Sequence, residues 1–153
     1  MDPHKPFGSL GSPEHGQAGR QIGEEGIVLL QNNGNLLPID LNKAKKIAVI
    51  GENAIKMMTV GGGSSSLKVK YEISPLDGLK SRVGSKAEVV YARGYVGDPT
   101  GEYNGVKTGQ DLKDNRSEDE LLAEALQVAK DADYVIFFGG LNKSNHQDCE
   151  DSD

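Results

Sequence analysis

The chain has 153 residues and a formal net charge of −6, from 17 Lys and Arg against 23 Asp and Glu. This acidic balance argues against nucleic acid as a partner, because the chain has no net positive charge to neutralise phosphates. No apolar run approaches the roughly 20 residues that span a bilayer, so we expect no membrane span. The single cysteine excludes an intrachain disulfide and a cysteine-rich zinc site. Length and composition predict one soluble domain without a cofactor.

The N-terminal part predicts a linker followed by a helix. Residues 1–12 are rich in Pro and Gly and indicate an extended lead-in, so we place the domain at 13–153. A helix begins at Ser12-Pro13-Glu14, with Ser as N-cap, Pro at the first helical position and an acid near the positive end of the dipole. A narrow stripe at helical spacing extends this helix to the turn at residues 32–35. The stripe consists of Ala18, Ile22, Gly26 and Leu29.

Three strands and two more helices follow. Residues 45–51, 88–92 and 133–140 predict strands, of which the first and third are apolar enough to be buried on both faces. Ser74-Pro75 begins a helix that runs to about Val83, and a capping box of Ser117 and Glu120 begins the last helix. This order predicts an α/β three-layer sandwich around a doubly wound, mostly parallel sheet.

The sheet is expected to be incomplete. Three strands are few for a doubly wound sheet, which usually has five or six. The length of the chain points the same way and indicates part of a domain. An apolar edge strand is an open template for another chain, so we also expect self-association through the unfinished sheet.

Function is expected at the carboxyl ends of the strands, in residues 51–66, 93–116 and 139–153. The glycines at 61–66 suggest phosphate binding, but neither the dinucleotide fingerprint nor Gly-Lys-Ser/Thr is present. Glu52 would also repel a phosphate at the end of its strand. A flexible loop is favoured here, and a loop shaped for close approach of a ligand is a second possibility. The long polar loop at 93–116 indicates either function or disorder.

The last segment is dense in acidic and nucleophilic side chains: His146, Asp148, Cys149, Glu150, Asp151 and Asp153. Their spacing matches neither a calcium loop nor a zinc pattern. The simplest interpretation is a frayed acidic terminus. The sharper one is that a carboxylate serves as a general acid, which requires a raised pKa. Cys149 has only His146 nearby in sequence as a base, so an unreactive thiol is favoured.

Together the segments resemble the C-terminal α/β-sandwich domain of family 3 glycoside hydrolases. The resemblance runs in order along essentially the whole chain. It is carried by residues 20–32, Leu36-Leu37-Pro38-Ile39, residues 47–54, Gly61-Gly62-Gly63-Ser64-Ser65, residues 74–79, Tyr91-Ala92-Arg93-Gly94, residues 129–133 and Phe138-Gly139-Gly140-Leu141.

The resemblance implies a retaining, exo-acting β-glycosidase of the β-glucosidase type, acting on a β-linked oligosaccharide or β-glucoside. In this family a barrel-like N-terminal domain, missing here, carries the Asp nucleophile. The sandwich domain supplies the acid/base Glu, often within Glu-Gly-x-Asp-Arg. By this resemblance, Glu150 takes the position of the acid/base Glu and Asp153 the position of the Asp. Two features differ from the family pattern: Asp151 stands where the family has Gly, and the chain stops before the Arg. We therefore expect the isolated chain to be inactive.

Two other interpretations stay open. The first is a non-catalytic α/β module that binds a sugar or a nucleotide. The second is a truncated fragment with no independent function. The location is not fixed by the sequence, although a periplasmic or secreted parent enzyme is plausible.

Overall fold

The computed structural model describes residues 8, 11–57, 69–97 and 112–140 of the chain. The chain divides into two units, residues 1–38 and residues 39–153. Within the described ranges, none of the helices combines the length and the apolar character needed to cross a membrane. The predicted domain boundary at residue 13 stays a prediction.

The first unit contains helix α1 (Pro13–Glu25), which begins as predicted. Ser12 is its N-cap and accepts a hydrogen bond from the His15 amide, and Pro13 opens the first turn. The predicted end at residues 32–35 is wrong, because α1 stops at Glu25. Gly23 and Gly26 weaken the helix at this point, and β-branched residues follow. No residue of α1 is buried, and Ile22 of the predicted stripe is 72% exposed.

In the second unit, the described residues form a parallel sheet of three strands. These are β1 (Lys46–Ile50), β2 (Glu88–Ala92) and β3 (Tyr134–Phe137), in the order β2–β1–β3. Val49 of the central strand pairs with Tyr91 on one side and Ile136 on the other. The predicted parallel sheet is confirmed.

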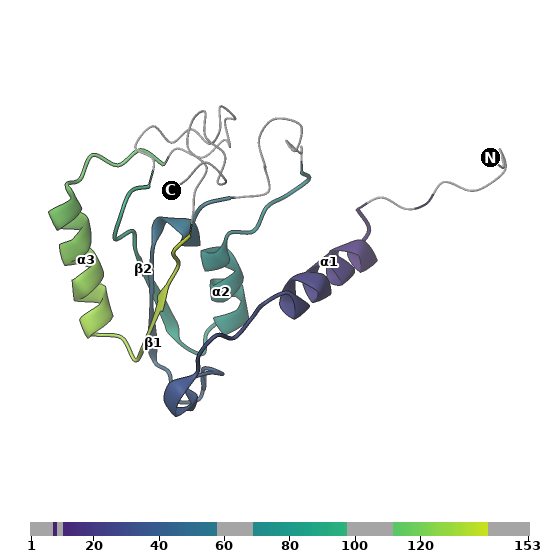
Figure 1. Cartoon of the computed structure of the whole chain (residues 1–153), viewed down its shortest axis with the longest axis horizontal. Coiled ribbons are helices and arrows are strands. Elements are labelled where there is room, and N and C mark those ends of the chain that lie inside the picture. Colours follow the sequence, from purple (N-terminus) through teal and green to yellow (C-terminus); the bar gives the residue numbers. More distant parts are fainter. Residues whose placement is uncertain (1–7, 9–10, 58–68, 98–111, 141–153) are drawn as a thin grey trace. The chain divides into compact units, whose positions relative to one another are not determined.

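Helices α2 (Pro75–Val83) and α3 (Glu118–Lys130) cover opposite faces of the sheet and complete three layers (Figure 1). On one face, fully buried Ile47 and Val49 share a core with Leu76 and Val83 of α2. On the other face, β1 presents Ala48 and Ile50, since successive strand side chains alternate. There α3 buries Leu121 and Ala125.

Strand β3 differs from the prediction of burial on both faces. Tyr134 and Ile136 pack on the core, but Val135 is 50% exposed and Phe137 63% exposed. The reason is the position of α3, which contacts β2 and β1. Alternation places Val135 and Phe137 on the same face as α3, where that helix leaves the edge strand open. Self-association through this edge stays a prediction.

Candidate site at the carboxyl edge of the sheet

All three strands end at the same edge of the sheet, as they must in a parallel arrangement (Figure 1). Glu52 follows β1 within the short 3-10 helix η2 (Glu52–Ala54). Arg93 follows β2, and Phe138 follows β3. Residues that are far apart in sequence are therefore neighbours here, and they form two groups.

The first group is a buried ion cluster, which we define as Glu52, Lys56, Arg93 and Asp114. The Glu52 side chain is fully buried, with Oε1 3.0 Å from Lys56 Nζ and Oε2 3.0 Å from Arg93 Nη2. The Gly97 amide donates a third hydrogen bond to Glu52, at 2.8 Å. Lys56 and Arg93 are themselves only 5–6% exposed, so the negative charge of Glu52 is balanced by cations that are buried with it.

Arg93 extends this cluster toward the start of α3. It donates to the Leu112 carbonyl and lies 3.3 Å from Asp114. Among the described residues, its Nε is the one buried side-chain nitrogen without a hydrogen-bond partner. Gly97 and Leu112 flank residues 98–111, so Glu52 and Arg93 hold the chain on both sides of that segment.

Asp114 connects the cluster to the surface through Arg116. Arg116 donates from Nη2 to Asp114 at 2.7 Å and from Nη1 to Glu124 of α3 at 2.6 Å. Hydrogen bonds from the Arg116 side chain and amide hold the pKa of Asp114 well below its usual range. Positive and negative side chains alternate along this series of ion pairs, which holds the segment that leads into α3.

The second group lies where β3 ends, and we call it the Tyr95 junction: Gly51, Asn53, Tyr95, Phe138 and Gly140. The Tyr95 hydroxyl donates to the Phe138 carbonyl at 2.9 Å and lies 3.2 Å from Asn53 Oδ1. The Tyr95 ring packs at a tilt on Phe137, with centroids 5.9 Å apart. Burial raises the pKa of Tyr95 above its ordinary value, which itself already keeps the hydroxyl protonated at neutral pH.

Two glycines allow the strand ends to approach one another at this junction. Gly51 has φ of 121°, and a Cβ on it would collide with the Phe138 carbonyl oxygen. A Cβ on Gly140 would lie 2.6 Å from Asn53 Nδ2. A side chain at Gly51 would therefore push β3's continuation away from the end of β1, because it would meet backbone atoms of Phe138.

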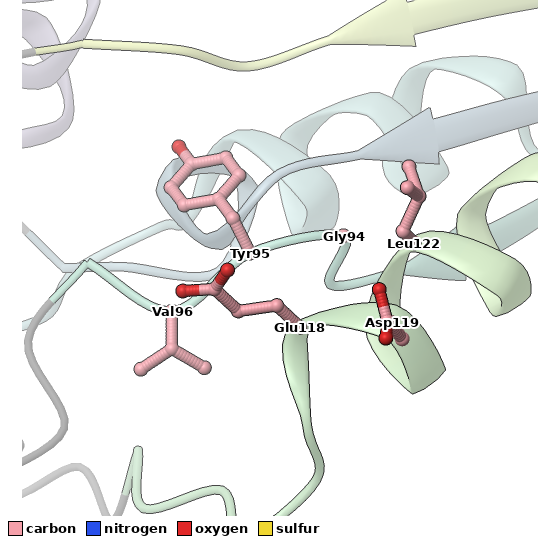
Figure 2. Close-up of a pocket in the computed structure, with 6 residues that line it drawn as sticks. All are labelled: Gly94, Tyr95, Val96, Glu118, Asp119 and Leu122. Carbon is pink, nitrogen blue, oxygen red and sulfur yellow. The ribbon is translucent and has the colours of Figure 1, made fainter.

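A shallow pocket of about 410 Å³ lies between the segment after β2 and the start of α3 (Figure 2). It is lined by Gly94, Tyr95, Val96, Glu118, Asp119 and Leu122. In Figure 2 the Glu118 carboxylate points toward the Tyr95–Val96 segment. Both acids stand in the first turn of α3, where they stabilise the helix dipole. The two acids thus have a structural role that needs no ligand.

The predicted site residues fall mainly outside the part of the chain that the structure describes. Glu150 and its neighbours from His146 to Asp153 lie outside the described residues, as do the glycines at 61–66. Across the described ranges, no group of His, Cys, Asp and Glu side chains is arranged to hold a metal ion. Glu52 was expected to repel a phosphate, but its charge is paired with Lys56 and Arg93.

Sequence reasoning missed the roles of Arg93 and Tyr95. Both stand just after β2, one strand away from Glu52 and Asn53. The available signal was that carboxyl ends of adjacent parallel strands meet, so polar residues after β1 and β2 should contact each other.

Comparison with known proteins gives a consistent result. The sequence model of the Glycosyl hydrolase family 3 C-terminal domain matches residues 27–153. The chain is 43% identical to Beta-glucosidase BoGH3A of Bacteroides ovatus, an alignment that covers 100% of this chain and 20% of that protein. It is 33% identical to a Beta-xylosidase of Formosa agariphila, over 91% of this chain and 17% of that protein.

The fold agrees with a solved structure as well. The β-glucosidase EmGH1 of Erythrobacter marinus superposes with a TM-score of 0.64 at 32% identity, covering 87% of this chain and 18% of that one. The chain thus spans about a fifth of the length of these relatives.

Proposed function

Because the chain belongs to glycosyl hydrolase family 3, we propose that it forms part of the active site of a retaining, exo-acting β-glycosidase of the β-glucosidase type. Its substrates are terminal β-linked sugars in oligosaccharides or β-glucosides. The observation that carries the proposal is the alignment of the whole chain with Beta-glucosidase BoGH3A at 43% identity.

The chain supplies one of the two carboxyl groups that the reaction needs. A retaining glycosidase uses a nucleophile that attacks the anomeric carbon and an acid/base that protonates the leaving oxygen, with the two groups roughly 5–5.5 Å apart. Glu150 is the acid/base of this proposal. The nucleophile, an Asp, comes from a barrel-like domain of the whole enzyme, so the isolated chain is inactive.

The proposal is consistent with the order of the elements along the chain. β3 ends at the carboxyl edge of the sheet, and Glu150 comes after it in the sequence. The same edge holds the ion cluster, whose charges are mutually satisfied. Ligands of doubly wound sheets bind at this edge, outside the ends of the strands.

The acid/base role is tested with Glu150→Ala in the full-length protein that carries this sequence. An aryl glycoside with a dinitrophenolate leaving group needs little protonation, whereas an alkyl glycoside or a disaccharide needs an acid. The variant is expected to lose at least about a hundredfold in kcat/KM on the disaccharide and far less on the activated glycoside.

Azide provides the second readout and a neighbouring carboxylate the control. Azide needs no base to attack a glycosyl-enzyme intermediate, so it should restore turnover of the activated substrate by Glu150→Ala and yield a β-glycosyl azide. Asp148→Asn should behave like the wild type on both substrates. Equal losses on the two substrates in Glu150→Ala would contradict the acid/base role, and an α-glycosyl azide would contradict retention.

A further inference from the structure

We propose that one face of strand β3 is the docking surface for a helix of the same polypeptide, namely the helix that follows β3 in the whole protein. We call this surface the β3 face and define it by four side chains, two from α3 and two from β3: Leu122, Leu126, Val135 and Phe137. The inference concerns how the fold is completed, so it does not depend on the proposed function.

The four side chains of the β3 face are large, apolar and exposed. Val135 is 50% exposed and Phe137 63% exposed, while Leu122 and Leu126 are each 53% exposed. The other two side chains of β3 point to the opposite face of the sheet and pack on the core. Because parallel sheets are almost always covered on both faces, the exposed face of this strand lacks the layer that such a sheet requires.

The geometry of α3 places its two exposed leucines beside this strand. Leu121 and Ala125 are the buried residues of α3, so they mark the side of the helix that faces the sheet. Each residue turns a helix by about 100°, so Leu122 and Leu126 share one flank of α3. Since the crossover from β2 through α3 to β3 is right-handed, that flank is the one toward β3. In Figure 2 the Leu122 side chain points from α3 toward the side where β1 lies, and β1 is the neighbour of β3.

A helix fits the β3 face better than a strand from a second copy does. Val135 and Phe137 stand on the face of the sheet, not at its edge. Pairing β3 with the β3 of a second copy would extend the sheet through its backbone and leave these two side chains on an uncovered face. A helix packed next to α3 would cover both of them and would also bury Leu122 and Leu126 on its flank.

The topology of the sheet indicates which helix this is. β2 and β3 lie on opposite sides of β1, so a further parallel strand beside β3 would continue the direction of the step from β2 to β3. A right-handed crossover in that direction puts its helix on the face that carries α3. The helix would run parallel to α3, with the positive end of its dipole at the edge where Glu118 and Asp119 stand. This chain spans 20% of Beta-glucosidase BoGH3A, so a whole protein of that length has ample polypeptide to supply the helix.

The test uses photo-cross-linking in the full-length protein that carries this sequence. The photoreactive residue p-benzoylphenylalanine replaces Leu122, Leu126 or Phe137, one position at a time, and mass spectrometry identifies the peptides that are cross-linked on irradiation. We expect all three positions to cross-link within one polypeptide, to a single segment between β3 and the next strand of the sequence. Ala123 is the matched control, because it is exposed on the same helix but two positions after Leu121, and so points away from the sheet. The probe at Ala123 should not reach that segment.

The spacing of the cross-links shows whether the segment is a helix. Leu122 and Leu126 are four residues apart, which is about 6 Å along the axis of α3. A helix parallel to α3 should therefore be cross-linked at two sites about four residues apart, with the site for Leu126 later in the sequence. An extended segment rises about 3.3 Å per residue, so its two sites would be about two residues apart, and that result would contradict the inference.

Three other results would overturn the inference. A cross-linked product with the mass of a dimer would show that a second copy covers the β3 face. A cross-link to a segment that precedes β3, or to one beyond the next strand, would show that another part of the polypeptide covers it. No cross-link from any of the three positions would show that the face is open to solvent. None of these outcomes depends on hydrolytic activity, so the inference and the proposed function can fail separately.

Discussion

Replacing Glu52 by Gln should destabilise the fold strongly, because it removes the carboxylate that two buried cations contact. The Glu52 carboxylate accepts hydrogen bonds from Lys56, Arg93 and the Gly97 amide at 2.8–3.0 Å. The side chains of Glu52, Lys56 and Arg93 are each at most 6% exposed. Removing one member of a buried ion pair costs about 3–5 kcal/mol. We therefore expect Glu52→Gln to lower the free energy of unfolding by about 3 kcal/mol.

Urea denaturation of the chain, followed by circular dichroism, measures this loss. Glu88→Gln is the matched control, because Glu88 is 64% exposed and lies 4.0 Å from Lys46, so its loss should cost under about 1 kcal/mol. Arg93→Met combined with Glu52→Gln should cost less than the sum of the two single changes, by about 1–3 kcal/mol. A Glu52→Gln effect as small as that of the control, or strict additivity in the cycle, would refute this reasoning.

Three further changes test other parts of the fold. Ser117→Ala should cost about 1 kcal/mol in thermal denaturation by uncapping α3, and Ser117→Asp should cost less. Gly51→Ala should lower the free energy of unfolding by more than about 2 kcal/mol, because the new Cβ would clash with Phe138. Gly19→Ala, whose Cβ would lie in open space, should be neutral or stabilising. Similar effects of the two changes would contradict this. Hydrogen bonds from the amides of Lys46 and Lys45 lower the pKa of Asp133 in the folded chain. The unfolded chain therefore binds more protons at acidic pH, so the ionised Asp133 stabilises the fold above the ordinary carboxyl pKa. This contribution to stability fades as pH falls below about 4. The stability difference between wild type and Asp133→Asn should shrink over that acidic range, and a constant difference would argue against it.

Local chemistry made most elements predictable. Each of the three long helices begins after a serine that accepts a backbone amide, and the patterns around Ser12, Ser74 and Ser117 indicated all three starts. The second strand matched its predicted range, because charged or glycine residues bound a short apolar run. Such signals act over a few residues and need no tertiary information.

Burial and long-range contacts were less predictable. The apolar run of β3 resembles that of β1, yet Phe137 is exposed because α3 covers the neighbouring strands instead. Arg93 meets Glu52 across 41 residues, and Tyr95 meets Phe138 across 43. Only the strand order brings these pairs together. The proposed role of Glu150 rests on the family resemblance, since no local pattern distinguishes it from the acids around it.

The most direct test of the account is a crystal structure of the full-length protein with an unhydrolysed β-linked disaccharide analogue bound. We expect a Glu150 carboxylate oxygen to lie within hydrogen-bond distance, about 2.6–3.2 Å, of the glycosidic oxygen. We also expect an Asp from outside this chain to lie below the anomeric carbon, roughly 5–5.5 Å from Glu150. A different carboxylate against the glycosidic oxygen, with Glu150 remote from the sugar, would contradict it.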